Sequence, residues 1–357
     1  MYHALLRQGV EFTNFGNHCR PPSNTLLGKL SSKFTLQKHK ASKQDFEKFA
    51  ARARKEIQKS DCDLVFAPVA SAELYYLSQH GKVDVPVVYA SDVTFSDLLK
   101  LYKPKIDDEQ IALQNTYETA ALSYADKVVY PTEWATRSAI SDYQVPSDKL
   151  EVAPYGANIS DLPLMEDVER KLTSKCCRLV FIGVAWERKG GDLVVETFKI
   201  LREKGFNVEL YILGSNPRLD ITDENLHVIP FLNKNLAADR ARFNDILLNS
   251  HFLLFPTKAD TFGIVNCEAN AYGIPVIASD AGGVPSVIRE GINGHVLPVA
   301  APASKYADAI AKYLTPEGIN KELYRSLMLS ARKEFDTRLN WDAWGESVYA
   351  LIKSMVT

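Results

Sequence analysis

The sequence has no hydrophobic run that approaches the roughly 20 residues needed to span a bilayer. Its first residues, MYHALLRQGVEF, also lack the continuous apolar stretch of a signal peptide. The formal net charge of −2 gives no basis for strong attraction to nucleic acid. The five cysteines have no metal-ligand spacing, and we expect all of them to be reduced. These absences predict a cytoplasmic protein that does not bind nucleic acid. The cysteines are Cys19, Cys62, Cys176, Cys177 and Cys267.

Length and composition predict two folded domains. Of the 357 residues, 46% are apolar and 24% are charged, which is ordinary for globular proteins and sufficient for two cores. Short runs rich in β-branched and aromatic residues alternate with longer helical patterns. This alternation predicts α/β domains of the doubly wound type, with parallel sheets buried on both faces. The expected strands are 64–69, 85–90, 127–131, 179–184, 208–213, 252–255 and 275–278, and the main helices are 45–59, 107–124, 191–204 and 240–249.

The alternation is interrupted between residues 154 and 175 and restarts at Leu179. We therefore predict an N-terminal Rossmann-like domain over residues 1–160 and a C-terminal one over residues 175–339. A last helix follows from Trp341 and carries two indoles, so it needs a large surface to pack on.

The N-terminal domain opens in an unusual way. Residues 1–9 are typical of a helix and residues 10–15 of a strand that follows it. A doubly wound domain normally opens with a strand and a glycine-rich turn before its first helix. We therefore expect this domain to lack its first strand.

The most informative stretch runs from Phe255 to Pro298. After a strand, a loop carries Asp260, Gly263 opens a helix, and Glu268 lies one to two turns into that helix. Helix N-termini suit phosphate, whereas carboxylates beside a diphosphate repel it and more readily bind hydroxyls. A diphosphate flanked by hydroxyl-binding acids describes a nucleotide-sugar. The alternative is an ordinary acid near a helix N-terminus and one solvated glutamate.

The first turn of the same domain, FIGVAWERKGGD over residues 181–192, connects a strand to a helix. It contains neither GxGxxG nor GxxxxGK[ST], so it is neither a dinucleotide fingerprint nor a P-loop. It carries Arg188 and Lys189, cations that would neutralise a leaving diphosphate. Two solvated loop charges are the alternative. The later Gly282-Gly283 turn permits close backbone approach, or is an ordinary tight turn.

Together, these pieces resemble the C-terminal half of family 4 of the glycosyltransferases, which have the GT-B fold of two Rossmann-like domains facing across a cleft. The order and spacing of the pieces carry the resemblance from Leu179 to Pro298. Residues 152–157, VAPYGA, resemble the family's segment before the linker, and the helix over residues 340–357 resembles the one that crosses back onto the N-terminal domain. The pieces are Lys189-Gly190, Asp260 to Glu268 with the Gly263 helix, Gly282-Gly283 and Asn293-Gly294.

The resemblance implies a retaining glycosyltransferase of the hexosyltransferase type, which moves a sugar from a nucleotide diphosphate sugar to an acceptor hydroxyl without a metal or cofactor. It implies that Asp260 binds the sugar hydroxyls, Glu268 the ribose, and Lys189 the departing diphosphate. The backbone N–H groups that would hold sugar and phosphate are those near Phe262, Gly263 and Ile264, and the residues bordering the base are Phe231 and Leu232.

Three departures from the family pattern stand out. Asp260 replaces the usual glutamate, and Val184 replaces the usual arginine of the first turn, a role we expect Arg188 to take. We find no counterpart in the sequence of the first strand and glycine-rich loop that normally approach diphosphate and acceptor, and expect both to be missing. Two alternative functions therefore stay open: a catalytically impaired nucleotide-sugar-binding protein, and a nucleotide-sugar epimerase on the same fold.

Three further features concern the acceptor side and metals. Asp92 follows a predicted strand where the family often has histidine, so it is either a catalytic-site group facing the sugar or the N-cap of the next helix. Asp61-Cys62-Asp63 resembles a metal-binding DxD but precedes its strand, so we expect no metal site. Residues 29–59 hold ten Lys or Arg against three acids, which favours either a solvated helix or peripheral contact with anionic lipid or a phosphorylated acceptor. The acceptor itself, whether saccharide, lipid-linked or small molecule, is not identified by these patterns.

Overall fold

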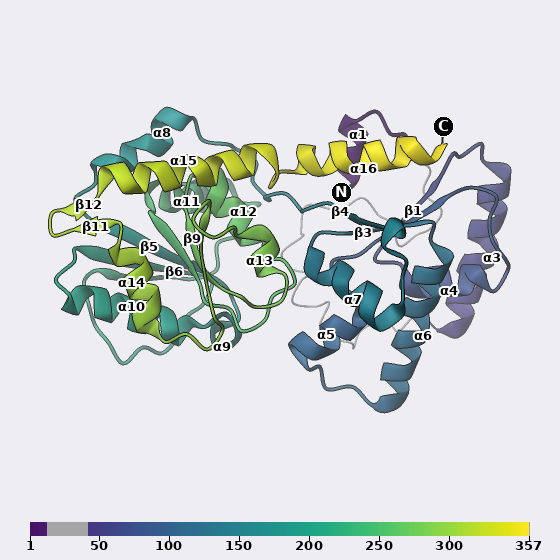
Figure 1. The fold of residues 1–357 in the computed structure, drawn as a ribbon, viewed down its shortest axis with the longest axis horizontal. Helices are drawn as coiled ribbons and strands as arrows, with labels where there is room; N and C mark the ends of the chain where they lie inside the picture. The colour runs from purple at the N-terminus through teal and green to yellow at the C-terminus, as the bar shows by residue number, and fades with distance from the viewer. Residues whose placement is uncertain (13–41, 357) are drawn as a thin grey trace. The chain divides into compact units, whose positions relative to one another are not determined.

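The computed structural model describes residues 1–12 and 42–356, and the chain divides into two compact units (Figure 1). Unit 1 comprises Met1–Ala153 together with Gly345–Thr357, and unit 2 comprises Pro154–Trp344. Each unit contains its own parallel sheet. The last helix, α16 (Trp341–Val356), begins in unit 2 and continues in unit 1.

Unit 1 is built on a four-stranded parallel sheet in the order β1-β2-β3-β4. Polar caps start its helices: Ser42 and Asp45 form a capping box on α3, and Thr132 accepts from Ala135 N–H at the start of α7. The β2 strand is buried along its whole length, which explains its continuous apolar run. The elements are α1 (Tyr2–Arg7), α3 (Lys43–Lys59), β1 (Val65–Pro68), α4 (Ser71–Ser78), β2 (Val87–Ala90), α5 (Phe95–Tyr102), α6 (Asp108–Tyr124), β3 (Lys127–Tyr130), α7 (Glu133–Tyr143) and β4 (Leu150–Val152).

Unit 2 is built on a six-stranded parallel sheet in the order β10-β9-β8-β5-β6-β7. The adjacent strands β5 and β8 are separated along the chain by β6 and β7, so the strand order reverses between them. Open α/β sheets bind their ligands at the carboxyl ends of the strands beside such a reversal. The elements are α8 (Met165–Glu169), β5 (Cys177–Ile182), α9 (Trp186–Lys189), α10 (Gly191–Glu203), β6 (Val208–Leu213), β7 (Leu226–Ile229), α11 (Ala237–Asn249), β8 (Phe252–Phe255), α12 (Ile264–Ala271), β9 (Val276–Ser279), α13 (Val284–Val287), β10 (Gly294–Leu297), α14 (Ala303–Ala311), β11 (Leu314–Thr315), β12 (Gly318–Ile319) and α15 (Lys321–Thr337).

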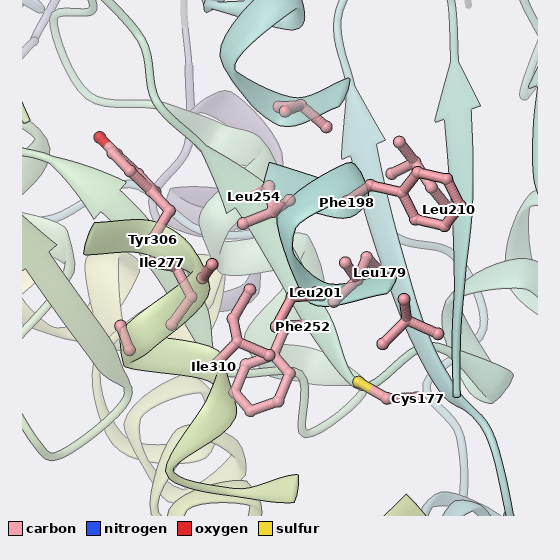
Figure 2. Close-up of a cluster of buried hydrophobic side chains, with 14 of the residues drawn as sticks. Cys177, Leu179, Phe198, Leu201, Leu210, Phe252, Leu254, Ile277, Tyr306 and Ile310 are labelled. Atoms are coloured by element: carbon pink, nitrogen blue, oxygen red, sulfur yellow. The ribbon is translucent and has the colours of Figure 1, made fainter. Parts of the chain in front are cut away.

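The core of unit 2 holds β5 and β8 in place (Figure 2). Leu179, Leu210 and Leu254, from three adjacent strands, pack with Phe198 of α10 and Ile310 of α14, and all five are completely buried. Burying one such side chain contributes about 1.5–3 kcal/mol. The loops that leave β5 and β8 therefore start from a rigid base.

The α/β class with parallel sheets is confirmed, and each predicted strand from residue 64 onward coincides with an observed one. Five short strands of the described residues were not predicted: β4, β7, β10, β11 and β12. The strand expected over residues 10–15 is wrong for residues 10–12, which form no regular structure, and residues 13–15 lie outside the described part of the chain. The weakly patterned stretch 154–175 contains α8 and a short 3-10 helix, Arg170–Thr173.

Candidate functional site

The loops after β5 and β8 are joined at the carboxyl edge of the unit 2 sheet. Gly190 has a φ of +75°, and a Cβ at this position would lie 2.2 Å from Pro256 O. Arg188 crosses between the loops: its Nη1 donates to Ala259 O at 2.6 Å, and its carbonyl accepts from Lys258 N–H at 2.8 Å. Because only glycine permits both this φ and this approach, Gly190 fixes the spacing of the two loops.

Lys189 and Asp260 form the central ion pair of these loops. Lys189 Nζ donates to Asp260 Oδ2 and lies 4.5 Å from the centroid of the Phe255 ring. The two charged side chains are only 14% and 12% exposed, so neither is a solvated loop charge. Arg188 Nη1 lies 4.0 Å from the same carboxylate oxygen. The Asp260 carbonyl also accepts from Gly283 N–H at 3.1 Å, which attaches the paired-glycine turn to this loop.

The helix α12 starts directly after this loop. Gly263 precedes it with a φ of +80°, as the sequence predicts for a residue that opens the helix. The first turn of a helix has unpaired N–H groups and a positive dipole end, which attract anions. Phe262 is 2% exposed, and its ring lies 5.3 Å from that of Tyr155, so only its backbone is available for a ligand.

Sequence reasoning missed Asn266, in the first turn of α12. Its side chain is completely buried, and neither amide atom has a hydrogen-bond partner within the described residues. A Cβ on Gly263 would lie 2.7 Å from Asn266 Nδ2, so the side chain packs directly under the helix start. Its place in the first turn of the helix that was predicted to bind phosphate was the available signal.

Glu268 is paired with a residue that sequence reasoning also missed. Lys234 Nζ donates to Glu268 Oε1 at 2.7 Å, and the Glu268 side chain is 7% exposed. Burial raises the pKa of Glu268, while the Lys234 ammonium and a hydrogen bond from the Asn158 backbone oppose this rise. The predicted alternative, a solvated glutamate, is wrong. Lys234 lies only two residues after Leu232, and that proximity to the predicted base-bordering pair was the available signal.

Phe231 and Leu232 lie in the loop after β7. Phe231 is 51% exposed and Leu232 is half-buried. An exposed aromatic ring offers a flat apolar surface of the kind on which a nucleobase stacks. The loop therefore carries a suitable surface for a base, and it also carries the lysine that contacts Glu268.

Unit 2 combines a helix N-terminus, three cations and two buried carboxylates, which are carried by the loops after β5, β7 and β8 and by α12. Such a set suits a ligand that carries both negative charge and hydroxyl groups. Residues 176–316 match the family described as glycosyl transferases group 1.

This part of the chain, most of unit 2, is thus similar to that family.

Curated relatives in the family are distant. The capsular polysaccharide biosynthesis glycosyltransferase CapM of Staphylococcus aureus is 23% identical over 242 residues, which cover 65% of this chain and 63% of that protein. A D-inositol 3-phosphate glycosyltransferase of Actinosynnema mirum is 24% identical over 285 residues, covering 74% of this chain and 66% of that protein. The chain thus spans a little under two thirds of the length of these relatives.

Solved structures share the fold. A glycosyltransferase from Rickettsia africae has a TM-score of 0.64 at 14% identity, over 90% of this chain and 84% of that chain. Anabaena HepE in complex with UDP has a TM-score of 0.63 at 14% identity, over 86% of this chain and 82% of that chain. These similarities confirm the predicted GT-B fold class.

Asp92 belongs to unit 1 and follows β2. The N-cap of α5 is Thr94, whose side chain accepts from Asp97 N–H, so the N-cap interpretation of Asp92 is wrong. Asp92 is half-buried, and its charge contributes to raising the pKa of Glu118. Its predicted role in a group 1 glycosyl transferase stays a prediction.

Glu118 is a buried carboxyl that sequence reasoning did not single out. It lies on α6 and accepts from Tyr89 Oη at 3.2 Å and from Tyr130 Oη at 3.5 Å, on β2 and β3. Burial raises its pKa to about 7. Unit 1 therefore contains a carboxyl that titrates near neutral pH.

The remaining predictions concern the DxD sequence, the cysteines and the basic segment. Asp61 and Asp63 are exposed before β1, and within residues 1–12 and 42–356 no group of three or more His, Cys, Asp or Glu side chains is arranged to hold a metal. The four cysteines in the described part are free, and Cys19 lies outside it.

Of the basic segment 29–59, residues 29–41 also lie outside the described part, and the rest forms mainly α3. No described helix is long and apolar enough to cross a membrane.

Proposed function

We propose that this chain is a retaining, metal-independent glycosyltransferase that transfers a hexosyl group from a nucleotide diphosphate sugar to an acceptor hydroxyl. One observation carries the proposal. Lys189 and Asp260, which come from loops 71 residues apart, form an ion pair beside the start of α12. This brings a cation, a carboxylate and a helix N-terminus to one place, next to the strand-order reversal.

The cations and the helix would stabilise the leaving group. In this proposal, Lys189 and Arg188 neutralise the charge that develops on the departing diphosphate. The backbone N–H groups of Gly263 and Ile264 hold its oxygens. Cations already fixed in a largely buried site need little reorganisation as charge develops, which is the most effective form of electrostatic catalysis.

Asp260 and Glu268 would bind hydroxyls of the two ends of the donor. Asp260 accepts from the transferred sugar, and Glu268 accepts from the ribose while Phe231 and Leu232 border the base. Both carboxylates keep unused acceptor positions, because an ionised carboxylate offers about four and each lysine contact uses one. On the acceptor side, we assign Asp92 of unit 1 as the polar group that faces the sugar.

The neighbours suggest which compounds to test first. Anabaena HepE has been solved with UDP and with UDP-glucose, so uridine diphosphate hexoses are the first donors to try. The relatives are named for capsular polysaccharide synthesis and for D-inositol 3-phosphate, which points to saccharide and phosphorylated cyclitol acceptors. We also propose that the protein acts in the cytoplasm, where its thiols would stay reduced, with residues 29–59 as the candidate contact for an anionic acceptor or lipid surface.

The test is incubation of the full chain with a panel of nucleotide-sugars, with and without saccharide acceptors, followed by chromatography of the products. Free nucleoside diphosphate together with a glycosylated acceptor supports the proposal. An isomerised donor without release would identify an epimerase instead. Donor binding without either product would indicate a protein that binds nucleotide-sugars but does not turn them over.

A further inference from the structure

Lys234 is held on several sides around the Glu268 carboxylate. Its ammonium lies 2.7 Å from Glu268 Oε1, 3.4 Å from Asn158 O and 4.7 Å from the centroid of the Phe243 ring. The Lys234 side chain is 19% exposed. We call these four residues, Lys234, Glu268, Asn158 and Phe243, the Lys234 cluster.

The backbone of Lys234 is fixed as well. Arg240 Nη1 donates to Lys234 O at 3.2 Å, and the adjacent Asn233 N–H donates to Asp239 at 2.8 Å. Arg240 and Asp239 both lie on α11, so the helix holds the loop that carries the lysine. Lys234 is therefore a fixed cation with a set direction, unlike a surface lysine that samples many rotamers.

The carboxylate needs such a partner because it is buried. Glu268 without Lys234 would be a nearly solvent-excluded acid, and burial favours its neutral form. A neutral carboxyl carries a proton on one oxygen and cannot accept from two neighbouring hydroxyls as well as an ionised one can. Lys234 and the Asn158 backbone N–H each occupy one acceptor position of the carboxylate, which leaves about two of its four positions for a pair of vicinal hydroxyls.

We propose that Lys234 is the positioning residue for ribose recognition: it fixes the Glu268 carboxylate so that both hydroxyls of a ribose reach it, and this makes the chain select ribonucleotides over 2′-deoxyribonucleotides. The inference rests on the proposed function, because it assumes that a nucleotide ribose lies at Glu268. It adds a residue outside the family motif and a selectivity that follows from its contact.

The experiment is calorimetric titration of the full chain with UDP and with 2′-deoxy-UDP, with GDP and ADP as further probes. The variants are Lys234→Met, which removes the charge, and Lys234→Arg, which keeps it. Lys305→Met on α14, outside the cluster, is the control for loss of one lysine in the same unit. Thermal melting of each variant checks folding, and Lys234→Gln replaces Lys234→Met if the latter melts early.

We expect the unmodified chain to bind UDP more tightly than its 2′-deoxy form. Lys234→Met should weaken UDP binding by roughly 10- to 100-fold, the effect of losing a charge-assisted hydrogen bond. The same substitution should weaken the binding of 2′-deoxy-UDP much less. The preference for ribose would then nearly disappear, and Lys234→Arg should restore most of it. If Lys234 had only a structural role, its substitution would weaken the binding of UDP and of 2′-deoxy-UDP equally.

Failure of this inference can be told apart from failure of the proposed function. If a folded Lys234→Met protein keeps the full preference for UDP, or if the unmodified chain has no such preference while still binding UDP, the role of Lys234 is refuted and the proposed function stands. If the folded, unmodified chain binds none of the nucleoside diphosphates, both are refuted.

Discussion

Gly190 and Pro256 approach so closely that a single methyl group on the glycine would lie 2.2 Å from the proline carbonyl oxygen. Gly190→Ala should therefore force the loops after β5 and β8 apart and move Lys189 away from Asp260. The left-handed φ of +75° alone costs an alanine about 1–2 kcal/mol, and the clash adds to this. We expect a lower melting temperature and a large loss of donor turnover.

Gly205 provides a matched control for that substitution. Its φ is +82°, but a Cβ there would meet nothing within 4 Å. Gly205→Ala should therefore show the backbone cost without the clash. If thermal melting shows the same destabilisation for both alanine variants, the close approach at Gly190 has no energetic importance.

Asp260→Ala should reduce donor turnover more than it reduces binding of free nucleoside diphosphate. Its proposed partners are hydroxyls of the transferred sugar, and losing a hydrogen bond to a charged group costs about 1.5–3 kcal/mol. Turnover should therefore fall at least about 10-fold, while the Kd for UDP should not rise. The measurements are initial rates with the best donor and calorimetry with UDP. An equal loss in both would show that Asp260 serves the diphosphate and not the sugar.

Removal of divalent metal should leave turnover unchanged. In the proposed site, Lys189 and Arg188 supply the positive charge that a metal would otherwise bring to the diphosphate. Rates measured after dialysis against a chelator should match those measured with added magnesium or manganese. Activity that disappears with the chelator and returns with manganese would contradict the metal-independent mechanism.

Glu118 should make the stability of unit 1 depend on pH. Its folded-state pKa of about 7 lies above the ordinary 4.5, so the folded chain keeps a proton that the unfolded chain releases. The stabilising effect is complete below pH 4.5 and is lost as the pH rises to about 7. This rise in the pKa corresponds to about 3 kcal/mol of unfolding free energy.

Glu118→Gln keeps the shape of the side chain and removes the titration. The difference in unfolding free energy between this variant and the unmodified chain should grow as the pH rises from 4.5 to 7, with the glutamine variant becoming relatively more stable. Hydrogen exchange in α6 and urea unfolding at several pH values both measure this. Glu109→Gln, an exposed position on the same helix, is the control. A constant difference across this range would mean that Glu118 does not titrate there.

The strands of both sheets could be predicted because buried parallel strands are nearly continuous apolar runs. The Lys189 and Asp260 loops could also be predicted, since each follows such a strand and ends at a glycine that opens or precedes a helix. Lys234 could not be found in this way. Its loop follows β7, a short and half-buried strand, and its partner Glu268 lies 34 residues away.

Burial was the other property that the sequence did not reveal. Asp260 and Glu268 have the spacing of acids that could lie in solvent, and only the fold shows that both are enclosed and paired with lysines. Glu118 is similar, because one acid among the apolar positions of α6 gives no sign of the two tyrosines that surround it. Contacts between side chains from different strands depend on the sheet order, which local patterns do not specify.

The two lysine–carboxylate pairs have a consequence for competition by simple anions. Each lysine in the site already has an internal anion, so an incoming phosphate must displace a carboxylate before it gains a full contact. Inorganic phosphate or sulfate offers nothing to the displaced Asp260 or Glu268, which would be left buried and unpaired at a cost of several kcal/mol. A nucleotide-sugar replaces both contacts: its phosphate oxygens bind the lysines, and its hydroxyls donate to the two displaced carboxylates. Under the proposed function, the ion pairs therefore weaken the binding of inorganic anions and favour ligands that carry both phosphate and hydroxyl groups.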